Sequence, residues 1–539
     1  MNICGSSAQP DGAKGKTHPQ AGGQLPIQVF VTAAEAYPAL ERAFLAARHE
    51  VIAGFRVFDL GTGLRCPEGR AVGKTWLDLV AHTLRRGVAV KIILSDFDPV
   101  ARPRLHRATW PTVRMLYAAA EMAGPGARLT VVPAMHDAVA GLAPRTLLWP
   151  MILSRLMRTT GWLRGLLPPL RQTALRDMPG VRRLLTNAAD DRPRPRLLPV
   201  PPLFPVTHHQ KLAVFDGCRL YIGGLDLDER RYDTPSHRLP GHETWHDVQL
   251  MVEGPVAGDA RAHLQGFLTT VAANAPPAAA TPDRQGLRLV RTLSRRRVRG
   301  AARSLAPEPL VAEIEEAHHH AIGQASRLIY IETQYFRDRR LSRLLAAEAR
   351  RKPDLQMILI LPAAPDDVAF DGATGLDARL GEFHQARALR ILKKAFGQRL
   401  FVGGAAQPRR TGATGREQLH GAPLVYIHAK VSIFDDHQAI VSSANLNGRS
   451  LRWDTEAGLV LSRPEEVKAL RLRLMSHWLP ERAGKPFFDP DTAVRAWAEL
   501  AARNARTAPE QRRGFLLPYD IRSAEVFGRD LPLLPEELV

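Results

Sequence analysis

One short motif occurs twice among the residues that could perform chemistry. Each copy reads His-x-Lys-x4-Asp, with His209, Lys211 and Asp216 in the first and His428, Lys430 and Asp435 in the second. An imidazole can attack phosphorus or protonate an oxygen, and an ammonium can neutralise a non-bridging phosphoryl oxygen. Because side chains two positions apart in a strand share a face, each His and Lys would point together into a cleft. The motif therefore predicts a catalytic site for a phosphate ester.

The aspartates of the motif have the opposite parity. Asp216-Gly217 is a strong hairpin-turn dipeptide, and Asp435 begins the turn Asp435-Asp436-His437. We count Asp216 and Asp435 in the catalytic set as members of the motif, although a hairpin corner or a structural ion pair suits their positions better. One match to the motif would be weak, but two matches in equivalent hairpins are poorly explained by chance.

The segments around the motifs recur in the same order, which indicates an internal duplication. The matching pairs are 51–60 with 327–336, 87–99 with 354–366, and 209–227 with 428–446. They comprise an apolar strand, a helix followed by a buried strand, and the motif hairpin. Helical stretches at 39–49 and 310–326 complete a βα alternation. We expect an α/β fold with two similar α-β-α sandwich lobes, mainly parallel central strands, and the active site at the interface between the lobes.

The first copy contains an insertion. Leu94 to His209 spans 115 residues and Leu361 to His428 spans 67, which places 48 extra residues within about 100–205. Residues 146–185 are rich in Trp, Leu, Met and Arg. The expected apolar face comprises Trp149, Met151, Leu153, Leu156, Trp162, Leu163, Leu166 and Leu167, beside Arg155, Arg158, Arg164 and Arg171. Such a helical segment could lie in a bilayer interface through 146–171, or could form an ordinary cover over the first lobe.

Composition and length limit the other possibilities. At 539 residues, with 45% hydrophobic residues, the chain is long enough for two cores. The net charge of +20 favours an anionic partner, either nucleic acid or an acidic membrane, although codon bias toward Arg would explain it equally well. Cys4, Cys66 and Cys218 are too few and too scattered for a disulfide framework or a zinc site. The sequence contains no run of 18 apolar residues, so it predicts no transmembrane helix.

We divide the chain into four parts. Residues 1–26 form a disordered leader without a signal peptide, 27–290 the first lobe, 291–480 the second lobe, and 481–539 a C-terminal extension packed on the lobes.

Several blocks beyond the two motifs resemble the phospholipase D superfamily, and most closely phospholipase D proper of the plant and animal type. They are GGLDLDERRYDTPSH (223–237), WHDVQLMVEGPVAGDA (245–260), IYIETQYF (329–336), SSANLNGRS (442–450) and DTEAGLV (454–460). The resemblance covers most of residues 27–480. The calcium-binding and phosphoinositide-binding modules of plant and animal members have no counterpart in this sequence.

The resemblance implies a two-step displacement through a phosphohistidine. By similarity, His209 is the nucleophile and His428 the general acid and then base, although the symmetry of the motifs leaves this order open. Lys211 and Lys430 would bind phosphoryl oxygens. Further candidates are Asp247 and Glu456 to orient the imidazoles, Asn445 and Ser443 to bind the phosphate, and Asp226 and Gln334 to line the pocket.

The activity implied by the resemblance is hydrolysis of phosphatidylcholine-like glycerophospholipids at the distal phosphodiester, giving phosphatidic acid and a free head-group alcohol, with transphosphatidylation as a second outcome. A cardiolipin synthase-like phosphatidyltransferase and a nuclease of the same superfamily remain alternatives. The expected partners are the phospholipid substrate and a membrane surface, with no obligate nucleic acid, and we expect a monomer. We expect a cytoplasmic protein with peripheral membrane association; export without a cleaved signal peptide is the alternative.

The chemistry requires no cofactor and no metal, because lysines, an amide and an imidazolium can meet the transition-state charge. The run His318-His319-His320 invites a metal interpretation. Consecutive helical residues point in different directions, so we predict a solvated helix face there.

Overall fold

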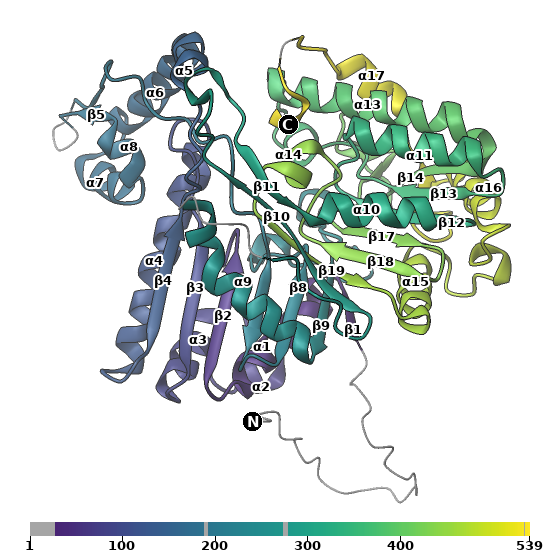
Figure 1. Ribbon diagram of the computed structural model, residues 1–539, viewed down its shortest axis with the longest axis horizontal. Helices are drawn as coiled ribbons and strands as arrows, with labels where there is room; N and C mark the ends of the chain where they lie inside the picture. Colours follow the sequence, from purple (N-terminus) through teal and green to yellow (C-terminus); the bar gives the residue numbers. More distant parts are fainter. Residues whose placement is uncertain (1–26, 188–191, 273–278, 533) are drawn as a thin grey trace, which may run out of the picture.

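The structure of the chain is a computed structural model that describes residues 27–187, 192–272, 279–532 and 534–539. It forms two lobes, each built on one large mixed β-sheet (Figure 1). The predicted disordered leader, residues 1–26, lies outside the described residues. No helix within the described ranges is long and apolar enough to cross a bilayer.

The sheet of the first lobe has seven strands in the order β1-β9-β8-β7-β2-β3-β4. Their bounds are β1 Gln28–Val31, β2 Glu50–Phe55, β3 Ala89–Ser95, β4 Leu129–Ala134, β7 Leu212–Phe215, β8 Arg219–Gly223 and β9 Val248–Glu253. β2, β3 and β4 are parallel, whereas β7 runs antiparallel to β2 and begins the hairpin β7–β8. Each motif hairpin therefore starts at the edge where the parallel strands of its lobe end.

The second lobe repeats this order. Its central strands run β10-β19-β18-β17-β12-β13-β14, with β11 and β20 added at the two edges. The bounds are β10 Leu287–Arg295, β11 Glu308–Ala312, β12 Leu328–Thr333, β13 Gln356–Ile360, β14 Leu400–Ala405, β17 Lys430–Phe434, β18 Gln438–Ser442, β19 Glu456–Leu461 and β20 Leu516–Pro518. The predicted duplication and α/β fold are confirmed, and β10 starts slightly before the predicted lobe boundary at residue 291. The expectation of mainly parallel central strands is wrong: in each sheet only three strands are parallel, and the motif hairpin and its neighbours pair antiparallel.

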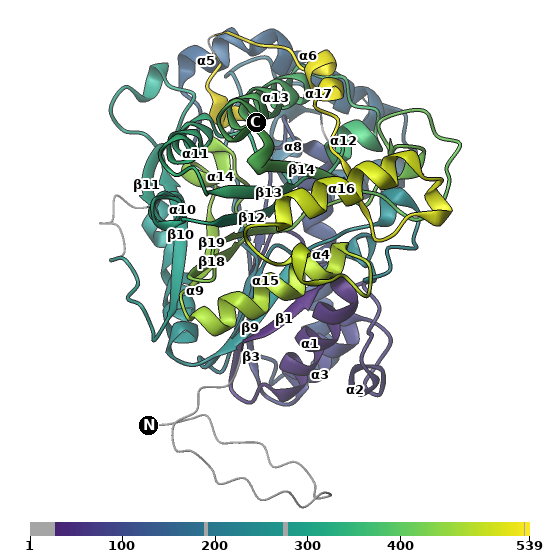
Figure 2. The same ribbon diagram turned by 90° about the vertical axis from the view of Figure 1, so that its right-hand side faces the viewer.

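Helices cover both faces of each sheet, because alternate strand residues point to opposite faces. In the second lobe, Ile329 and Ile331 of β12 pack toward α10, α11 and α13, while Tyr330 packs toward α15 and α16. Figure 2 shows α15 and α16 on the side of the molecule that faces the viewer. The first lobe has α1 Ala33–Ala46, α2 Pro67–Arg70, α3 Trp76–Arg85, α4 Pro103–Ala123 and α9 Pro255–Ala272. The second has α10 Glu313–Gln324, α11 Arg339–Arg351, α12 Asp366–Ala369, α13 Leu376–Phe396, α14 Gly448–Arg452, α15 Pro464–Trp478, α16 Ala493–Arg506 and α17 Ile521–Phe527.

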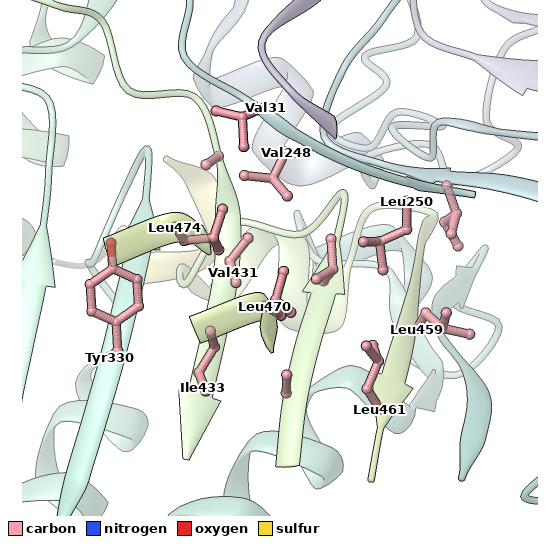
Figure 3. Packing of buried hydrophobic residues seen from close by; sticks show 14 of the residues in the cluster. Val31, Val248, Leu250, Tyr330, Val431, Ile433, Leu459, Leu461, Leu470 and Leu474 are labelled. Atoms are coloured by element: carbon pink, nitrogen blue, oxygen red, sulfur yellow. The ribbon is translucent and has the colours of Figure 1, made fainter. Parts of the chain in front are cut away.

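The two lobes share a hydrophobic core. Val248 and Leu250 of β9 lie in one buried cluster with Val431 of β17, Leu459 of β19 and Leu474 of α15 (Figure 3). All five are at most 1% exposed. This continuous packing fixes the relative position of the two motif hairpins.

The C-terminal extension completes the second lobe. β20 adds to the free edge of β14, and Arg452 of α14 forms an ion pair with Glu537 at 3.2 Å. Asn447 Nδ2 donates to the main-chain oxygen of Val539 at 3.2 Å. Residues near the end of the chain are thus tied to the helix that follows the SSANLNGRS block.

The insertion follows β4 and contains α5 Leu142–Leu147, α6 Trp149–Arg164, α7 Pro168–Arg176, α8 Pro179–Arg183 and the short hairpin β5 Leu185–Thr186 with β6 Arg194–Pro195. A second short hairpin, β15 Gln418–Leu419 with β16 Ala422–Pro423, occupies the equivalent interval of the other lobe. The predicted single apolar face of the insertion is wrong. α6 buries Ile152, Leu156 and Leu163 against its neighbours, and leaves Met151 and Trp162 exposed on the other side.

Candidate active site

Both motif histidines lie at the junction of the lobes. Main-chain hydrogen bonds cross between the lobes at this point: the N–H of His209 donates to Thr455 at 2.8 Å, and the N–H of His428 donates to His246 at 2.7 Å. Each histidine is therefore fixed to the segment that carries the candidate carboxylate of the other lobe. The two half-sites converge on one region.

Each imidazole is held by a carboxylate from the opposite lobe. His209 Nδ1 lies 3.0 Å from Glu456 Oε1 and 3.1 Å from Oε2. His428 Nδ1 lies 2.6 Å from Asp247 Oδ2. A carboxylate that accepts the Nδ1–H leaves the Nε2 lone pair available for attack. Within the described part of the chain, neither Nε2 has a hydrogen-bond partner.

Burial gives the two pairs different proton affinities. It raises the pKa of Glu456 to about 8 and that of Asp247 to about 6, against the opposing charges of the lysines. Burial, and then the neighbouring cations, lower the pKa of His209 and His428 well below the ordinary value. Two buried pairs whose proton affinities differ in this way can supply one base and one acid at the same pH.

The pKa values and the family resemblance assign the two histidines opposite roles. The pair with the lower pKa, His428 with Asp247, loses its proton first and would supply the nucleophile. The family resemblance instead gives that role to His209. The symmetry of the site permits both orders, and trapping of the phosphohistidine in single-histidine variants distinguishes them.

We predict a bell-shaped dependence of kcat/KM on pH. Below about 6 both histidine–carboxylate pairs hold a proton, so no imidazole offers a free lone pair, and above about 8 both pairs have lost it, so no acid remains. Burial lowers the pKa of Lys430 to about 7, so the loss of its charge adds to the alkaline fall. Rates on a soluble short-chain substrate would measure the profile. A profile that is flat across both limbs would contradict this assignment.

Both motif lysines are buried beside their histidines. Lys211 Nζ donates to the main-chain oxygen of His209 at 2.6 Å and lies 3.6 Å from Asp226 Oδ2. Lys430 Nζ donates to the main-chain oxygen of His428 and lies 3.5 Å from Gln334 Oε1. Because an ammonium has three N–H groups, each lysine retains a donor for a phosphoryl oxygen.

The serine and the asparagine of the SSANL block have different positions. The Ser443 hydroxyl donates to Glu456 and therefore supports the carboxylate that holds His209. Asn445 is buried, and its amide oxygen has no partner among the described residues. Since the amide can flip, Asn445 can turn its NH2 toward a bound phosphate.

The corresponding position in the first lobe is Asp226, whose carboxylate is already used. It accepts from the main-chain N–H groups of Arg56 at 3.0 Å and Val57 at 2.9 Å, and it pairs with Arg231 and Lys211. Asp226 therefore joins the strand end of β2 to the motif lysine, as a structural residue.

Gln334 lies in the pocket, and Arg56 is its counterpart. Gln334 Nε2 donates to the hydroxyl of Tyr426 at 2.8 Å. Phe58 bridges to Leu227 as Phe336 bridges to Leu446, which aligns Arg56 with Gln334. The sequence comparison missed Arg56 because its paired segments were two residues out of step. After burial and Lys211, the partly exposed guanidinium of Arg56 is a further cause of the lowered pKa of His209, and it adds positive charge to the phosphate region.

Arg231 and Trp245 were also missed. Trp245 packs against His428, with ring centroids 4.6 Å apart, and the Arg231 guanidinium lies 4.8 Å from the centroid of the Trp245 ring. Both residues belong to the blocks quoted for the family resemblance, and this was the available signal. Trp245 restrains the imidazole from one side, while Arg231 lowers the pKa of both motif histidines.

The assignment of Asp216 and Asp435 to the catalytic set is wrong. Both residues occupy hairpin corners with positive φ, 50° and 51°. Asp216 accepts from the main-chain N–H groups of 48, 49 and 50, and Asp435 accepts from those of 326, 327 and 328. These bonds give partners to the main-chain N–H groups at the start of β2 and of β12. Each aspartate thus lies at the opposite end of its hairpin from the histidine.

Asp435→Asn is therefore expected to reduce stability and leave catalysis nearly intact. Asparagine tolerates the left-handed conformation, but its amide lacks the negative charge of the carboxylate that accepts from three main-chain N–H groups. The change should lower the free energy of unfolding by about 1–3 kcal/mol. Urea unfolding and kcat, measured in parallel, test this. A kcat loss comparable to that of Lys430→Ala would return Asp435 to the catalytic set.

The His318–His320 run is not a metal site in the described structure. His319 and His320 are exposed, as predicted. The prediction is wrong for His318, which is buried, with Nδ1 2.8 Å from the oxygen of Ile314 and Nε2 3.1 Å from Ser432 Oγ. α10 turns this residue toward the sheet because it follows Ile314 by one helical turn.

Comparisons with known proteins agree with the resemblance seen in the sequence. The family described as "Cardiolipin synthase, PLD-like domain" matches residues 319–478. Phospholipase D alpha 1 of Vigna unguiculata is 25% identical over 363 residues, covering 46% of this chain and 44% of that protein. Phospholipase D1 of Saccharomyces cerevisiae is 25% identical over 346 residues, covering 48% of this chain and 20% of that protein. The matches thus span less than half the length of these relatives.

Among solved structures, the phosphatidylserine synthase of Haemophilus influenzae Rd KW20 aligns with 89% of this chain and 94% of its own, at 13% identity and a TM-score of 0.49.

Proposed function

Because the chain belongs to the phospholipase D superfamily, we propose that it is a phospholipase D. It would cleave the distal phosphodiester of phosphatidylcholine-like glycerophospholipids to phosphatidic acid and a free head-group alcohol. The observation that supports the proposal most is that each motif histidine is held by a carboxylate of the other lobe. Glu456 holds His209, and Asp247 holds His428. Two equivalent imidazoles beside two lysines form a two-sided site for one phosphodiester.

The proposed reaction has two steps. Nε2 of one histidine, His209 by family resemblance, attacks phosphorus while the bond to the head-group oxygen breaks, and the other imidazole gives that oxygen its proton. A water oxygen then attacks phosphorus, its proton passes to the second imidazole, and the P–N bond breaks. Lys211, Lys430 and Asn445 bind the phosphoryl oxygens in both steps. An alcohol in place of water gives transphosphatidylation.

The surface of the insertion favours a lipid substrate over nucleic acid. We define the insertion surface as Leu147, Met151, Met157, Trp162, Leu167 and Leu170, which are 40–81% exposed. Arg107 of the neighbouring α4 lies over the Trp162 ring at 5.0 Å, and Arg158 is exposed beside it. Apolar side chains interleaved with arginines suit the interface of an acidic bilayer. The insertion follows β4, on the same edge of the sheet as His209.

Leu147→Ser with Leu167→Ser is expected to weaken binding to anionic vesicles by about 10-fold or more, because each exposed leucine would otherwise be buried among lipid chains. Binding should also fall with salt. Vesicle sedimentation measures both effects. Val526→Ser, at an 87% exposed position outside the insertion, is the matched control. Equal binding by the double variant and the control would favour a plain helical cover.

The two alternatives from the same superfamily differ in substrate. A cardiolipin synthase-like enzyme would transfer the phosphatidyl group to a lipid alcohol, and a nuclease would use the +20 charge to bind nucleic acid. The deciding experiment incubates the protein in parallel with phosphatidylcholine vesicles, with and without glycerol or phosphatidylglycerol, and with plasmid DNA. Choline release with phosphatidic acid supports the proposal, transfer product alone supports the synthase, and nicking without choline release would overturn the lipid assignment.

A further inference from the structure

Three histidines form a cluster outside the motif residues. His237 and His246 come from the first lobe, in the RYDTPSH and WHDV blocks, and His477 comes from the last turn of α15 in the second lobe. One nitrogen of each lies within 4.8 Å of the others. His237 and His246 are fully buried, and His477 is partly exposed.

The cluster has the organisation of a ligand set. His237 Nδ1 is 2.7 Å from Asp233 Oδ2, and His246 Nε2 is 2.7 Å from Glu332 Oε2. Metal-binding histidines usually give their second N–H to a carboxylate, which fixes the tautomer and the ring orientation. These contacts leave His237 Nε2 and His246 Nδ1 without a carboxylate partner, so each is available as a ligand atom.

One of these lone pairs has no partner. His237 Nε2 lies 2.8 Å from His477 Nε2, so those two rings can share a proton. His246 Nδ1 is buried and has no hydrogen-bond partner among the described residues. Trp478 and Phe515 surround the rings, with the centroids of His246 and Trp478 4.3 Å apart and those of His237 and Phe515 5.3 Å apart. An unpartnered acceptor in an aromatic pocket is costly unless a ligand meets it.

We propose that His237, His246 and His477 bind a first-row transition-metal ion, with Zn²⁺ as the expected occupant. Imidazole nitrogens suit such ions, and the buried carboxylates of Asp233 and Glu332 offset the charge of the ion. Ligand nitrogens around tetrahedral Zn²⁺ are about 3.3 Å apart. The nitrogens of His237 and His477 must therefore separate slightly from 2.8 Å, and the wider separations in the cluster, up to 4.8 Å, must close. His477 can supply this movement because it lies at a helix end and is partly exposed, which also provides an entry path. Water would complete the coordination.

The ion would act by positioning, and it takes no part in the displacement at phosphorus. His246 immediately precedes Asp247, and its main-chain oxygen accepts the N–H of His428. Ligation of His246 therefore fixes the segment that holds one catalytic imidazole. Because His477 belongs to α15, the ion would also tie this segment to the second lobe.

Metal binding is tested on untagged full-length protein, without any assay of lipid hydrolysis. After chelation and dialysis, titration with Zn²⁺, read by elemental analysis, should give one ion per chain. Titration with Co²⁺ should give the ligand-field bands of a four-coordinate site. His477→Gln and Asp233→Asn should each weaken Zn²⁺ binding by about 10–100-fold, whereas His320→Gln, at an exposed position, should not. Zn²⁺ should raise the Tm of the wild type and of His320→Gln, but not that of His477→Gln.

Two outcomes would overturn the proposal: wild-type protein that takes up no stoichiometric Zn²⁺ or Co²⁺, or His477→Gln protein that binds as the wild type does. Metal uptake without choline release would leave the site in place and reject the proposed function. Choline release without metal uptake would reject the metal site and support the proposed function.

Discussion

His209→Ala and His428→Ala should each lower kcat by about 10³-fold or more, with little change in folding. Each imidazole lies at the junction of the lobes and has one nitrogen held by a buried carboxylate, and the proposed reaction needs both, so neither can substitute for the other. Choline release measures the loss. His318→Ala removes a buried imidazole outside the site and serves as the control.

A substrate with a good leaving group separates the two roles. Phosphatidyl-p-nitrophenol needs no protonation of its leaving group, so the variant that lacks only the acid and base should complete the first step and then stall. By family resemblance we expect His428→Ala to give a burst of nitrophenol and a phosphoryl label on His209, and His209→Ala to give neither. A label on His428 in the His209→Ala variant would reverse the order, as the lower pKa of the Asp247 pair suggests. Normal turnover by either variant would contradict the shared site.

Much of the fold could be predicted because the duplication shows each element twice. The parallel strands β2 and β12 and the two motif hairpins follow from apolar runs bounded by turn residues. The edge strands could not be predicted. β1 pairs with β9, over two hundred residues later, and β20 joins a sheet whose other strands precede it. Long-range pairing of this kind leaves no local pattern.

The register between the equivalent strands β2 and β12 of the two lobes could not be predicted from the sequence either. A two-residue shift between apolar strands keeps every side chain on the same face, so burial patterns cannot detect it. The main-chain bridges of Phe58 and Phe336 define the correct alignment of the two lobes. In this alignment Arg56 occupies the position equivalent to Gln334.

The two orienting carboxylates were predicted from the sequence, but which histidine each one holds was not. Asp247 and Glu456 were found as acids that follow the motif hairpins, but each lies closer in sequence to the histidine it does not hold. The exchange depends on how the two sheets pack, through a core that includes Val248 and Leu459. The cluster of His237, His246 and His477 escaped for the same reason, because its members come from both lobes.

Glu456→Gln and Asp247→Asn should each lower kcat by about 10²–10⁴-fold, since an amide cannot hold the Nδ1–H tautomer. Both changes keep the size of the side chain. Glu382→Gln, which removes a fully buried carboxylate paired with Arg416 at 2.7 Å, is the matched control and should stay near wild-type turnover. Vesicle binding should be unchanged in all three variants.

The exchange between lobes makes these two variants distinguishable. Asp247→Asn disables His428, so on phosphatidyl-p-nitrophenol it should resemble His428→Ala and accumulate phosphohistidine on His209. Glu456→Gln disables His209 and should accumulate none. If each carboxylate instead supported the histidine of its own lobe, the two patterns would be reversed. The identity of the variant that traps the intermediate, read together with the histidine that carries the label, therefore reports which lobe supplies each orienting carboxylate, independently of the size of the kcat loss.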